Sequence, residues 1–295
     1  MLRIKRIISP SIRHISTNNK ILQSIVKPMT KLNLDNSDNL DIKERNIDKI
    51  NNDSKLKIYI KDIYKYSGCG FGGSLASSIA FGGIAAGTTL MSGSLIPAVG
   101  LWIGNVGFGF YSLYKMSKIK SITKNDMTEE IPYDKKKWYT LFSISNGITL
   151  SPLVYMSFAI HPMIFPLALT STLGTFGGAT YYAFKQTNLD AIKWQAPLMG
   201  CVTGLICSSL VQIGASLMGY TTFAHGLDII STLGSTIVFT GLIVSDTQQA
   251  IKDFQDKQLD SINTSVDLLL DATNLLIDFI KILSEIMVAI KNVND

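Results

Sequence analysis

The chain has 295 residues, of which 46% are hydrophobic and 17% are charged, and its formal net charge at pH 7 is +5. The lysines are scattered and are not clustered with aromatic residues, which argues against a nucleic-acid-binding protein. Charge is frequent over residues 1–67 and absent over 68–114. A charged segment followed by long uncharged ones is typical of an integral membrane protein.

Residues 1–31 contain no acidic residue. Wound as a helix, they place isoleucines on one side and Arg3, Arg6 and Arg13 on the other. An arginine-bearing, serine-containing amphipathic start is typical of a mitochondrial transit peptide, and the apolar core of a secretory signal is lacking. A basic cytosolic arm is the alternative, since Pro10 weakens the helix. We predict a transit peptide over about residues 1–31.

Residues 32–56 are poor in aromatic side chains and rich in asparagine and aspartate, which predicts a disordered polar linker. Their aspartate spacing does not make an EF-hand. The glycine required at the sixth position of a loop starting at Asp35 is replaced by Leu40.

Seven apolar runs follow, each about long enough to cross the roughly 30 Å of bilayer hydrocarbon as a helix. Only helices and closed barrels satisfy the backbone in lipid, and continuous runs of this length form helices. We predict an all-α polytopic membrane protein, a seven-transmembrane-helix bundle over residues 57–291. The runs are 68–90, 95–114, 138–160, 162–184, 195–218, 224–245 and 263–290.

Small residues within these runs are predicted to pack helices together. Glycines four residues apart let helix backbones approach closely in lipid. Three cysteines without metal-ligand spacing are also expected to be small packing residues. The residues are Gly68/Gly72, Gly83/Gly87, Gly100/Gly104, Gly174/Gly178 and Gly200/Gly204, with Cys69, Cys201 and Cys207.

Lysines are unevenly shared between the two sides that seven crossings create. Four lie in 51–67, seven in 115–137, and two each in 185–194 and 246–262, whereas the opposite loops have none. Positively charged loops stay inside, so the N-terminus and the lysine-rich loops are expected on one side, the matrix in a mitochondrion. This predicts a multi-pass protein of the mitochondrial inner membrane. A partial or re-entrant path for the last, polar run is the alternative.

Carboxylates occur inside the last two runs. Run 224–245 leads into Asp246, Thr247 and Gln248. An ionisable group near the bilayer centre costs roughly 2.5–3.5 kcal/mol even on the mildest scale, so several of them predict a partner, a water-filled path or a bound cation. The last run carries six polar residues within an arc of about 80° on one helix face. This polar stripe consists of Asp267, Asp271, Asn274, Asp278, Lys281 and Glu285.

Structural interpretations stand beside the functional ones. Asp246 and Asp271 could be a hydrogen-bonded pair that pins two helices together. Asp228 precedes Asp246 by eighteen residues, on the same helix face and roughly 27 Å away. That spacing places Asp228 at the opposite mouth of a path, where solvation at the interface is the default explanation.

The residues at the ends of the polar stripe also have more than one interpretation. Asp267 could be a solvated first-turn residue. Asp278 and Glu285 could line a path toward the far side. However, Lys281 follows the first by three residues and precedes the second by four, which favours neutralisation of both.

Enzyme motifs are not found in the sequence. It has no Ser–His–Asp order, HExxH, Walker loop or cysteine nucleophile with a base. The aspartate contexts Ser245-Asp246 and Leu270-Asp271 differ from the Tyr-Asp and Gly-x-Gly-Asp signatures of intramembrane aspartyl proteases. We expect neither an enzyme nor a resident cofactor.

Four passages of the membrane region occur in a distinctive order and spacing. Together they resemble the third, fourth, sixth and seventh helices of the transmembrane Bax inhibitor motif (Bax inhibitor-1-like) family, over about residues 57–288. They are Ser151-Pro152-Leu153 with His161-Pro162, Thr172-Leu173-Gly174-Thr175-Phe176-Gly177-Gly178, Asp246-Thr247-Gln248, and Leu268-Leu269-Leu270-Asp271-Ala272-Thr273-Asn274-Leu275.

Three further passages resemble the mitochondrial branch of this family, the growth-hormone-inducible transmembrane proteins. They are Tyr59-Ile60-Lys61-Asp62, Ile131-Pro132-Tyr133-Asp134 and Ala196-Pro197-Leu198-Met199-Gly200.

The resemblance implies a seven-helix bundle with a calcium-permeable, pH-sensitive path, gated by a proton shared between two aspartates that match Asp246 and Asp271. The mitochondrial branch is linked to calcium–proton exchange across the inner membrane, to cristae maintenance and to resistance to apoptosis. The family's second-helix arginine has no counterpart here, and the nearest cation is Lys115. The phenylalanine after the family's asparagine is also missing, since Leu276 and Ile277 follow Leu275.

Physical chemistry is compatible with such a path. Two carboxylates about 3 Å apart cannot both ionise cheaply, so they titrate as a coupled pair. Calcium prefers 6–8 oxygen ligands, and Asp246, Asp271, Asn274 and Gln248 supply too few for tight binding without water. Loose, hydrated binding suits transport of Ca²⁺ in competition with protons.

A non-transporting scaffold in the lipid bilayer is the alternative. It would organise cristae or bind inner-membrane proteins through glycine-rich helix faces. Transport should depend on both aspartates, whereas a scaffold should survive their replacement by asparagine.

Overall fold

The computed structural model describes residues 54–92, 96–123, 129–186 and 189–294. The predicted transit peptide and nearly all of the predicted linker lie outside these residues. The described elements belong to one compact unit, Lys55–Asp295.

Seven long α-helices make up most of the described residues, one for each apolar run, so the all-α fold is confirmed. A 3-10 helix, η1 (Leu189–Trp194), precedes α7. An antiparallel hairpin of β1 (Ile122–Thr123) and β2 (Glu129–Glu130) lies between α4 and α5, with Ile122 opposite Glu130. The long helices are α3 (Ser54–Ser92), α4 (Ile96–Lys118), α5 (Tyr133–Ile160), α6 (Ile164–Lys185), α7 (Gln195–Leu217), α8 (Thr221–Gln255) and α9 (Ser261–Asn294).

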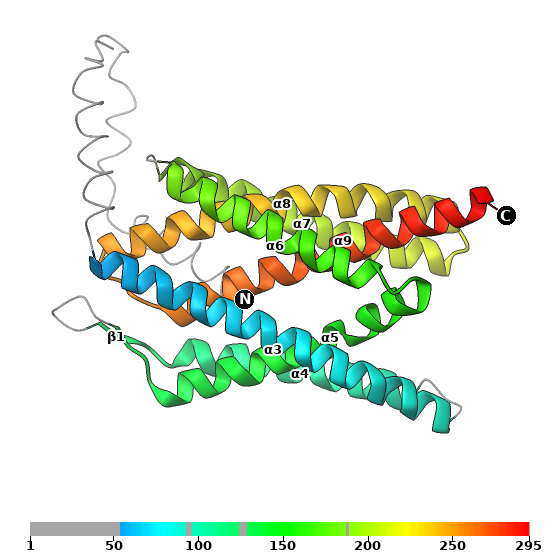
Figure 1. Ribbon diagram of the computed structural model, residues 1–295, viewed down its shortest axis with the longest axis horizontal. Helices are drawn as coiled ribbons and strands as arrows, with labels where there is room; N and C mark the ends of the chain where they lie inside the picture. Colours follow the sequence, from blue (N-terminus) through cyan, green and yellow to red (C-terminus); the bar gives the residue numbers. More distant parts are fainter. Residues whose placement is uncertain (1–53, 93–95, 124–128, 187–188, 295) are drawn as a thin grey trace, which may run out of the picture. The chain divides into compact units, whose positions relative to one another are not determined.

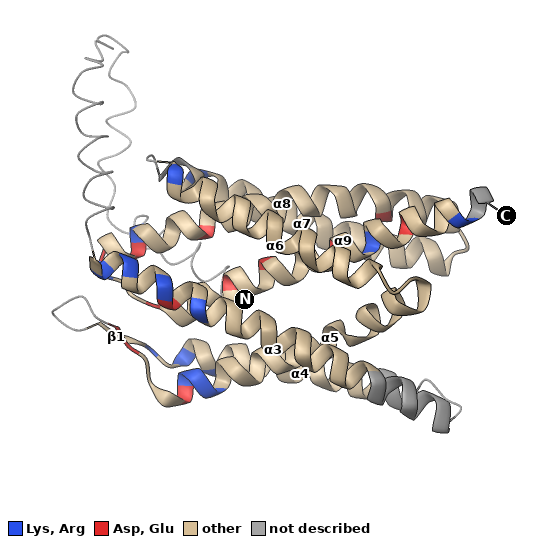
Figure 2. Ribbon diagram, in the orientation of Figure 1, with Lys and Arg blue, Asp and Glu red and all other residues tan. Residues whose placement is uncertain are grey.

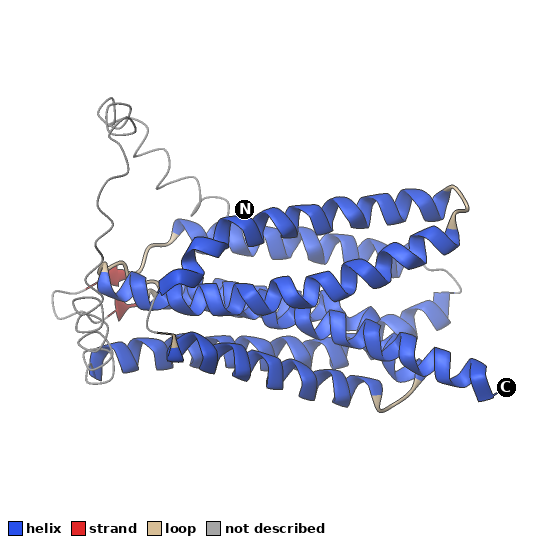
Figure 3. Ribbon diagram, turned by 90° about the horizontal axis from the view of Figure 1, so that it is seen from above, coloured by secondary structure: helices blue, strands red, loops and turns tan. Residues whose placement is uncertain are grey.

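The helices run alongside one another, and α9 lies in their midst (Figure 1 and Figure 3). Helix α9 packs against α5, α6 and α8, while α7 covers α8 and α4 covers α5. The hydroxyl of Ser265 on α9 also donates to the carbonyl oxygen of Ile63 on α3, at 2.8 Å. The aliphatic side chains of α9 therefore form the centre of the core, namely Leu268, Leu269, Leu275, Leu276 and Ile280, each at most 1% exposed.

Two segments within the described residues are long and apolar enough to cross a membrane, Ala191–Leu217 and Thr221–Gln255. The hydropathy of the other long helices is lowered by glycine, serine and threonine or, in α9, by the polar stripe. Hydropathy thus supports membrane insertion through two helices, and seven crossings remain a prediction.

Two helices extend beyond the predicted runs. Helix α3 begins at Ser54 rather than at 68, because Leu56, Tyr59 and Ile63 are buried at helical spacing. Helix α8 continues past Asp246 to Gln255, because Ala250, Ile251 and Phe254 stay buried in the same way. The Asp-Thr-Gln segment is therefore inside a helix and does not end one.

Within this chain, the predicted packing role of the glycine pairs is wrong for the members whose surroundings the structure describes. These glycines are exposed, and a Cβ atom at any of them would meet no atom within 4 Å. The physical reason is that these glycines lie on helix faces turned away from the neighbouring helices of this chain. The three cysteines are likewise exposed and free, contrary to the predicted packing role. The glycines concerned are Gly68, Gly72, Gly100, Gly104, Gly174, Gly178, Gly200 and Gly204.

Close helix contact occurs at other glycines instead. A Cβ atom at Gly147 would overlap the carbonyl oxygen of Ser74, and one at Gly70 would overlap the hydroxyl of Tyr139. Both positions join α3 to α5. These two helices approach closely because neither position carries a side chain.

Most described lysines lie at the end of the bundle where α3, α5 and α9 begin and α6 and α8 end (Figure 2). This arrangement brings the lysine-rich segments to one end. The C-terminal half of α9, with Lys281, points toward the other end.

Candidate functional site

The polar stripe of α9 runs from the buried centre of the bundle to its surface. Asp271 is fully buried, and Asp267 and Asp278 are each 6% exposed. Asn274 and Lys281 are half-buried, and Glu285 is exposed. The stripe thus places three carboxylates inside the bundle at spacings of four and seven residues, about one and two helical turns.

Three consecutive polar residues on α8, Asp246, Thr247 and Gln248, are each 1% exposed. The amide nitrogen of Gln195 on α7 donates to Asp246 Oδ1 at 3.3 Å. The side-chain oxygen of Gln248 accepts the backbone N–H of Ala191 in η1 at 3.0 Å. Successive residues of a helix point about 100° apart, so this short segment can join α8 to several neighbours at once.

Thr247 makes the third of these contacts. Its hydroxyl lies 2.8 Å from that of Tyr64 on α3, and the Tyr64 hydroxyl also donates to Thr180 Oγ1 on α6 at 3.3 Å. Burial raises the pKa of Tyr64 above its ordinary value, so the phenol stays protonated. The segment around Asp246 is therefore fixed by side chains of α3 and α7 and by a backbone N–H of η1, and α6 contributes through Tyr64.

Asp246 and Asp271 lie on helices that pack along each other, and neither carboxylate is free of interactions. A buried carboxylate must be neutralised by a proton, a cation or hydrogen-bond donors. Such a position can exchange a proton for a metal cation. That the two aspartates share one proton remains a prediction.

Asp278 joins α9 to α8 through a hydroxyl. Ser235 Oγ donates to Asp278 Oδ2 at 2.6 Å, and both side chains are buried. Asn274, one turn before Asp278, donates to the carbonyl oxygen of Leu270 on its own helix. These hydrogen bonds do not involve Lys281, the predicted counter-charge of Asp278.

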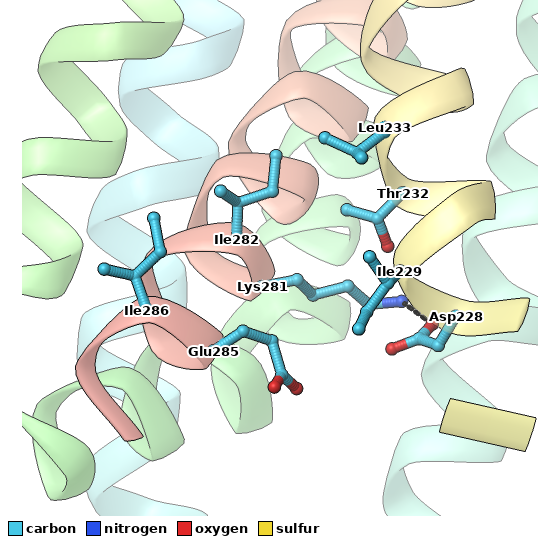
Figure 4. Close-up of a pocket in the computed structure, with 8 residues that line it drawn as sticks. All are labelled: Asp228, Ile229, Thr232, Leu233, Lys281, Ile282, Glu285 and Ile286. Atoms are coloured by element: carbon cyan, nitrogen blue, oxygen red, sulfur yellow. Dashed lines mark hydrogen bonds and ion pairs between the residues drawn. The ribbon is translucent and has the colours of Figure 1, made fainter. Parts of the chain in front are cut away.

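Lys281 instead pairs across helices. Its Nζ lies 3.0 Å from Asp228 Oδ1 on α8, and His225 Nε2 lies 3.6 Å from Glu285 Oε2. The long lysine side chain reaches the neighbouring helix, where Asp228 faces it (Figure 4). Asp228 is thus ion-paired, and simple solvation does not account for it.

At the opposite end, a buried ion pair was missed by the sequence analysis. Lys135 in the first turn of α5 is completely buried, and its Nζ lies 2.7 Å from Asp260 Oδ1 and 2.8 Å from Oδ2. Asp260 also accepts the backbone N–H of Asn263 at 3.2 Å. Lys135 was counted among the seven loop lysines. Its place one turn before the apolar part of α5 was the only sequence feature that set it apart.

The start of α9 is held by two further groups. The Glu129 carboxylate on β2 accepts the backbone N–H of Ser261 at 3.0 and 3.1 Å, and the backbone N–H of Asp260 donates to Tyr59 Oη at 3.3 Å. Carboxylates at a helix N-terminus satisfy its first N–H groups and complement its dipole. Burial raises the pKa of Tyr59, so its hydroxyl is uncharged.

Asn146 on α5 was also missed. Its amide nitrogen donates to Thr273 Oγ1 on α9 at 2.9 Å and to Ser74 Oγ on α3 at 3.3 Å. The polar density of its surroundings, Ser143 to Ser151, was the available signal. A polar network beside the stripe therefore joins α9 to α3 and α5.

Lys115, the cation nearest to the position of the family's second-helix arginine, has its Nζ 5.4 Å from the centre of the Tyr111 ring on α4. This cation–π contact gives the ammonium a partner on its own helix. Within the described ranges, no three histidine, cysteine or acidic side chains are grouped to hold a metal ion. A calcium ion here would depend on backbone, amide and water oxygens as well.

Comparisons with known proteins agree with these helices and motifs. The family model described as "Inhibitor of apoptosis-promoting Bax1" matches residues 57–287. An uncharacterized protein of Borreliella burgdorferi is 27% identical over 154 residues. That alignment covers 50% of this chain and 62% of the relative's length. No solved structure gave a significant match. Because the family model covers the helical region almost end to end, the chain belongs to this Bax inhibitor-1-like family of membrane proteins.

Proposed function

We propose that this protein is a pH-sensitive calcium leak channel or calcium/proton exchanger of the mitochondrial inner membrane, gated by Asp246 and Asp271. The observation that carries the proposal is the burial of Asp246, Asp267, Asp271 and Asp278 on two helices that pack together. Such costly groups in a membrane protein are expected to serve ion or proton movement.

The mechanism uses competition for the same oxygens. A proton on the pair lowers its negative charge and disfavours calcium, and loss of that proton attracts the cation. The carboxylates of the polar stripe continue from Asp271 toward Asp278 at one end and Asp267 at the other. Partly hydrated calcium would pass between them without tight binding.

Membership of the mitochondrial branch, with links to cristae maintenance and apoptosis resistance, is part of this proposal. So are seven crossings, with the N-terminus and the lysine-rich loops in the matrix. The gathering of lysines at one end of the bundle supports this orientation, because positive loops remain on the inner side (Figure 2). We propose no enzymatic activity and no resident cofactor.

The test is calcium entry into liposomes that contain the purified full-length protein, recorded as the external pH is varied. The double variant Asp246→Asn/Asp271→Asn is compared with Asp256→Asn, which removes an exposed carboxylate just beyond α8. We expect pH-dependent calcium entry with wild type and with the control, and loss of entry or of its pH dependence with the double variant. Wild-type liposomes no leakier than empty ones would overturn the proposal.

A non-transporting scaffold is the second candidate, and the outward-facing glycines favour it. Five glycines are exposed, and a Cβ atom added at any of them would meet no atom of another helix within 4 Å, namely Gly174, Gly177 and Gly178 on α6 and Gly200 and Gly204 on α7. Small outward residues allow another membrane helix to approach closely. In cells that lack the protein, the Asp246→Asn/Asp271→Asn variant of a scaffold should still restore cristae when it is expressed. A variant with bulky residues at Gly174 and Gly178 should not restore them.

A further inference from the structure

A cavity of about 160 Å³ lies between α8 and the C-terminal half of α9, about one turn beyond the buried Asp278. It is partly open to the outside of the bundle. Figure 4 shows its walls, with α8 contributing one side and α9 the other. The lining residues are Asp228, Ile229, Thr232, Leu233, Lys281, Ile282, Glu285 and Ile286.

The walls of the cavity are aliphatic. Leu233 is 53% exposed and Ile286 is 47% exposed. In a membrane, side chains exposed on the outer face of a helix meet lipid rather than water. An apolar cavity that opens there, with a volume near that of a cavity able to hold benzene, suits a hydrocarbon chain.

The rim of the cavity carries both signs of charge. Lys281 Nζ and Asp228 Oδ1 are 3.0 Å apart, with side chains 39% and 34% exposed. The Glu285 carboxylate, one turn further along α9, is 48% exposed and lies 3.6 Å from His225. One ammonium and two carboxylates beside an apolar cavity complement an amphiphile whose head carries a phosphate and an amine.

The depth of this rim fits a headgroup. Asp228 lies seven residues after the start of α8, which is about 10 Å along the helix. Tyr220 and Phe223, near that start, are 66% and 57% exposed. Aromatic side chains are enriched where helices leave the hydrocarbon, so the charged rim lies just inside the interface.

We propose that this cavity binds the first few methylene groups of one acyl chain of a zwitterionic aminophospholipid with an ethanolamine headgroup. Lys281 contacts the phosphate, and the primary ammonium donates hydrogen bonds to Glu285 and Asp228. A choline headgroup satisfies the carboxylates less well because it has no N–H to donate. A phosphoglycerol headgroup adds a negative charge beside two carboxylates without an ammonium to offset it.

Lipid retention is measured without calcium, so the result of this experiment does not depend on calcium transport. The experiment reconstitutes the full-length protein into vesicles of equal parts phosphatidylethanolamine, phosphatidylcholine and phosphatidylglycerol. The protein is then extracted in detergent and washed, and the retained lipids are counted by mass spectrometry. The variants are Leu233→Trp and Ile286→Trp, which fill the cavity from each helix, and Glu285→Gln.

The matched control is Ile237→Trp, one turn beyond Leu233, which is 74% exposed and outside the cavity. We expect phosphatidylethanolamine to be enriched on wild type and control. Either filling variant should lower its retention about tenfold, the effect of displacing two methylene groups. Glu285→Gln should reduce the preference for ethanolamine over choline while both lipids are still retained.

Three outcomes would overturn the proposal. Both filling variants could retain as much phosphatidylethanolamine as the control, or phosphatidylglycerol could be retained best. The filling variants could instead change the oligomeric state without changing lipid retention, which would assign the cavity to a second copy of the chain. Each outcome leaves the calcium-flux test untouched, so failure of the lipid site and failure of the transport function are separable.

Discussion

Two lysine–aspartate pairs in this bundle differ in their surroundings. Lys135 is completely buried beside Asp260, whereas Lys281 and Asp228 are each more than one-third exposed. A buried pair is costly to break because the remaining charge has no water to solvate it, while an exposed pair contributes little. The two pairs should therefore respond very differently to substitution.

Replacing Lys135 by methionine should destabilise the fold by about 1–3 kcal/mol, because Asp260, which is 25% exposed and keeps its bonds from Asn263, loses its charged partner at the start of α9. Thermal unfolding in detergent, followed by circular dichroism, should show a much lower midpoint. The neighbouring exposed Lys136→Met should leave the midpoint nearly unchanged. Adding Asp260→Asn to Lys135→Met should restore part of the loss. Equal melting of both single variants would contradict this role.

Removing the hydroxyl of Ser235 tests the link between α8 and α9 at Asp278. Ser235→Ala leaves a buried carboxylate oxygen without its 2.6 Å donor and should cost about 1–3 kcal/mol. Ser209→Ala is the control, because that exposed hydroxyl donates only within α7, to Leu205. Melting midpoints of the two variants that agree within error would show that the Ser235 contact does not stabilise the bundle.

The sequence predicts which residue types matter here but not which of them meet. The apolar setting of Asp246, Asp271 and Asp278 identified them as costly. Their partners depend on how helices rotate and slide, and no spacing within one helix reveals that Ser235 faces Asp278. For the same reason Lys281 was matched with carboxylates of its own helix when its partner is on α8.

At the scale of helices, length and hydropathy predict where each element lies, and each apolar run contains one helix. The ends depend on burial instead. Tyr59 and Phe254 each lie in a charged segment outside the apolar runs. Their ring centres are nevertheless 5.8 Å apart, and this contact accompanies the extension of α3 and α8 beyond the apolar runs. Whether a glycine faces a neighbouring helix also depends on how the helices pack. The four-residue spacing alone therefore predicted the wrong contacts.

The contact between α3 and α5 gives a sharp test of helix packing. Gly147→Ala places a methyl group against the carbonyl oxygen of Ser74 and should destabilise the protein by about 1–3 kcal/mol. Gly174→Ala adds the same methyl group where nothing lies within 4 Å, and should be neutral or slightly stabilising. Melting midpoints in detergent compare the two. A neutral Gly147→Ala would mean that the two helices have room to separate.

For the molecule as a whole, the sequence predicts the membrane setting and the family. Whether α8 crosses the membrane, and in which direction, is tested by cysteine labelling in a variant without Cys69, Cys201 and Cys207. Met218→Cys lies between α7 and α8, and Asp256→Cys lies between α8 and α9; both positions are exposed. In mitochondria stripped of their outer membrane, an impermeant maleimide should label position 218 and leave 256 unlabelled.

Other labelling patterns would contradict specific parts of the prediction. Labelling of both positions would mean that α8 does not cross the membrane. Labelling of 256 alone would preserve the crossing and reverse the orientation. Detergent should expose both positions in every case, which controls for their reactivity.

The central position of α9 has a consequence for biogenesis. Import led by an N-terminal transit peptide presents α3 to α8 to the membrane before α9, so with the seven proposed crossings the six earlier helices insert while the middle of their bundle is still vacant. Until α9 arrives, Asn146, Ser235 and Lys135 lack the partners that α9 and the residue before it provide. A chain halted in import before Ser261 would therefore expose polar side chains to lipid. Such chains are natural clients for membrane quality-control proteases and for insertion factors that hold helices apart.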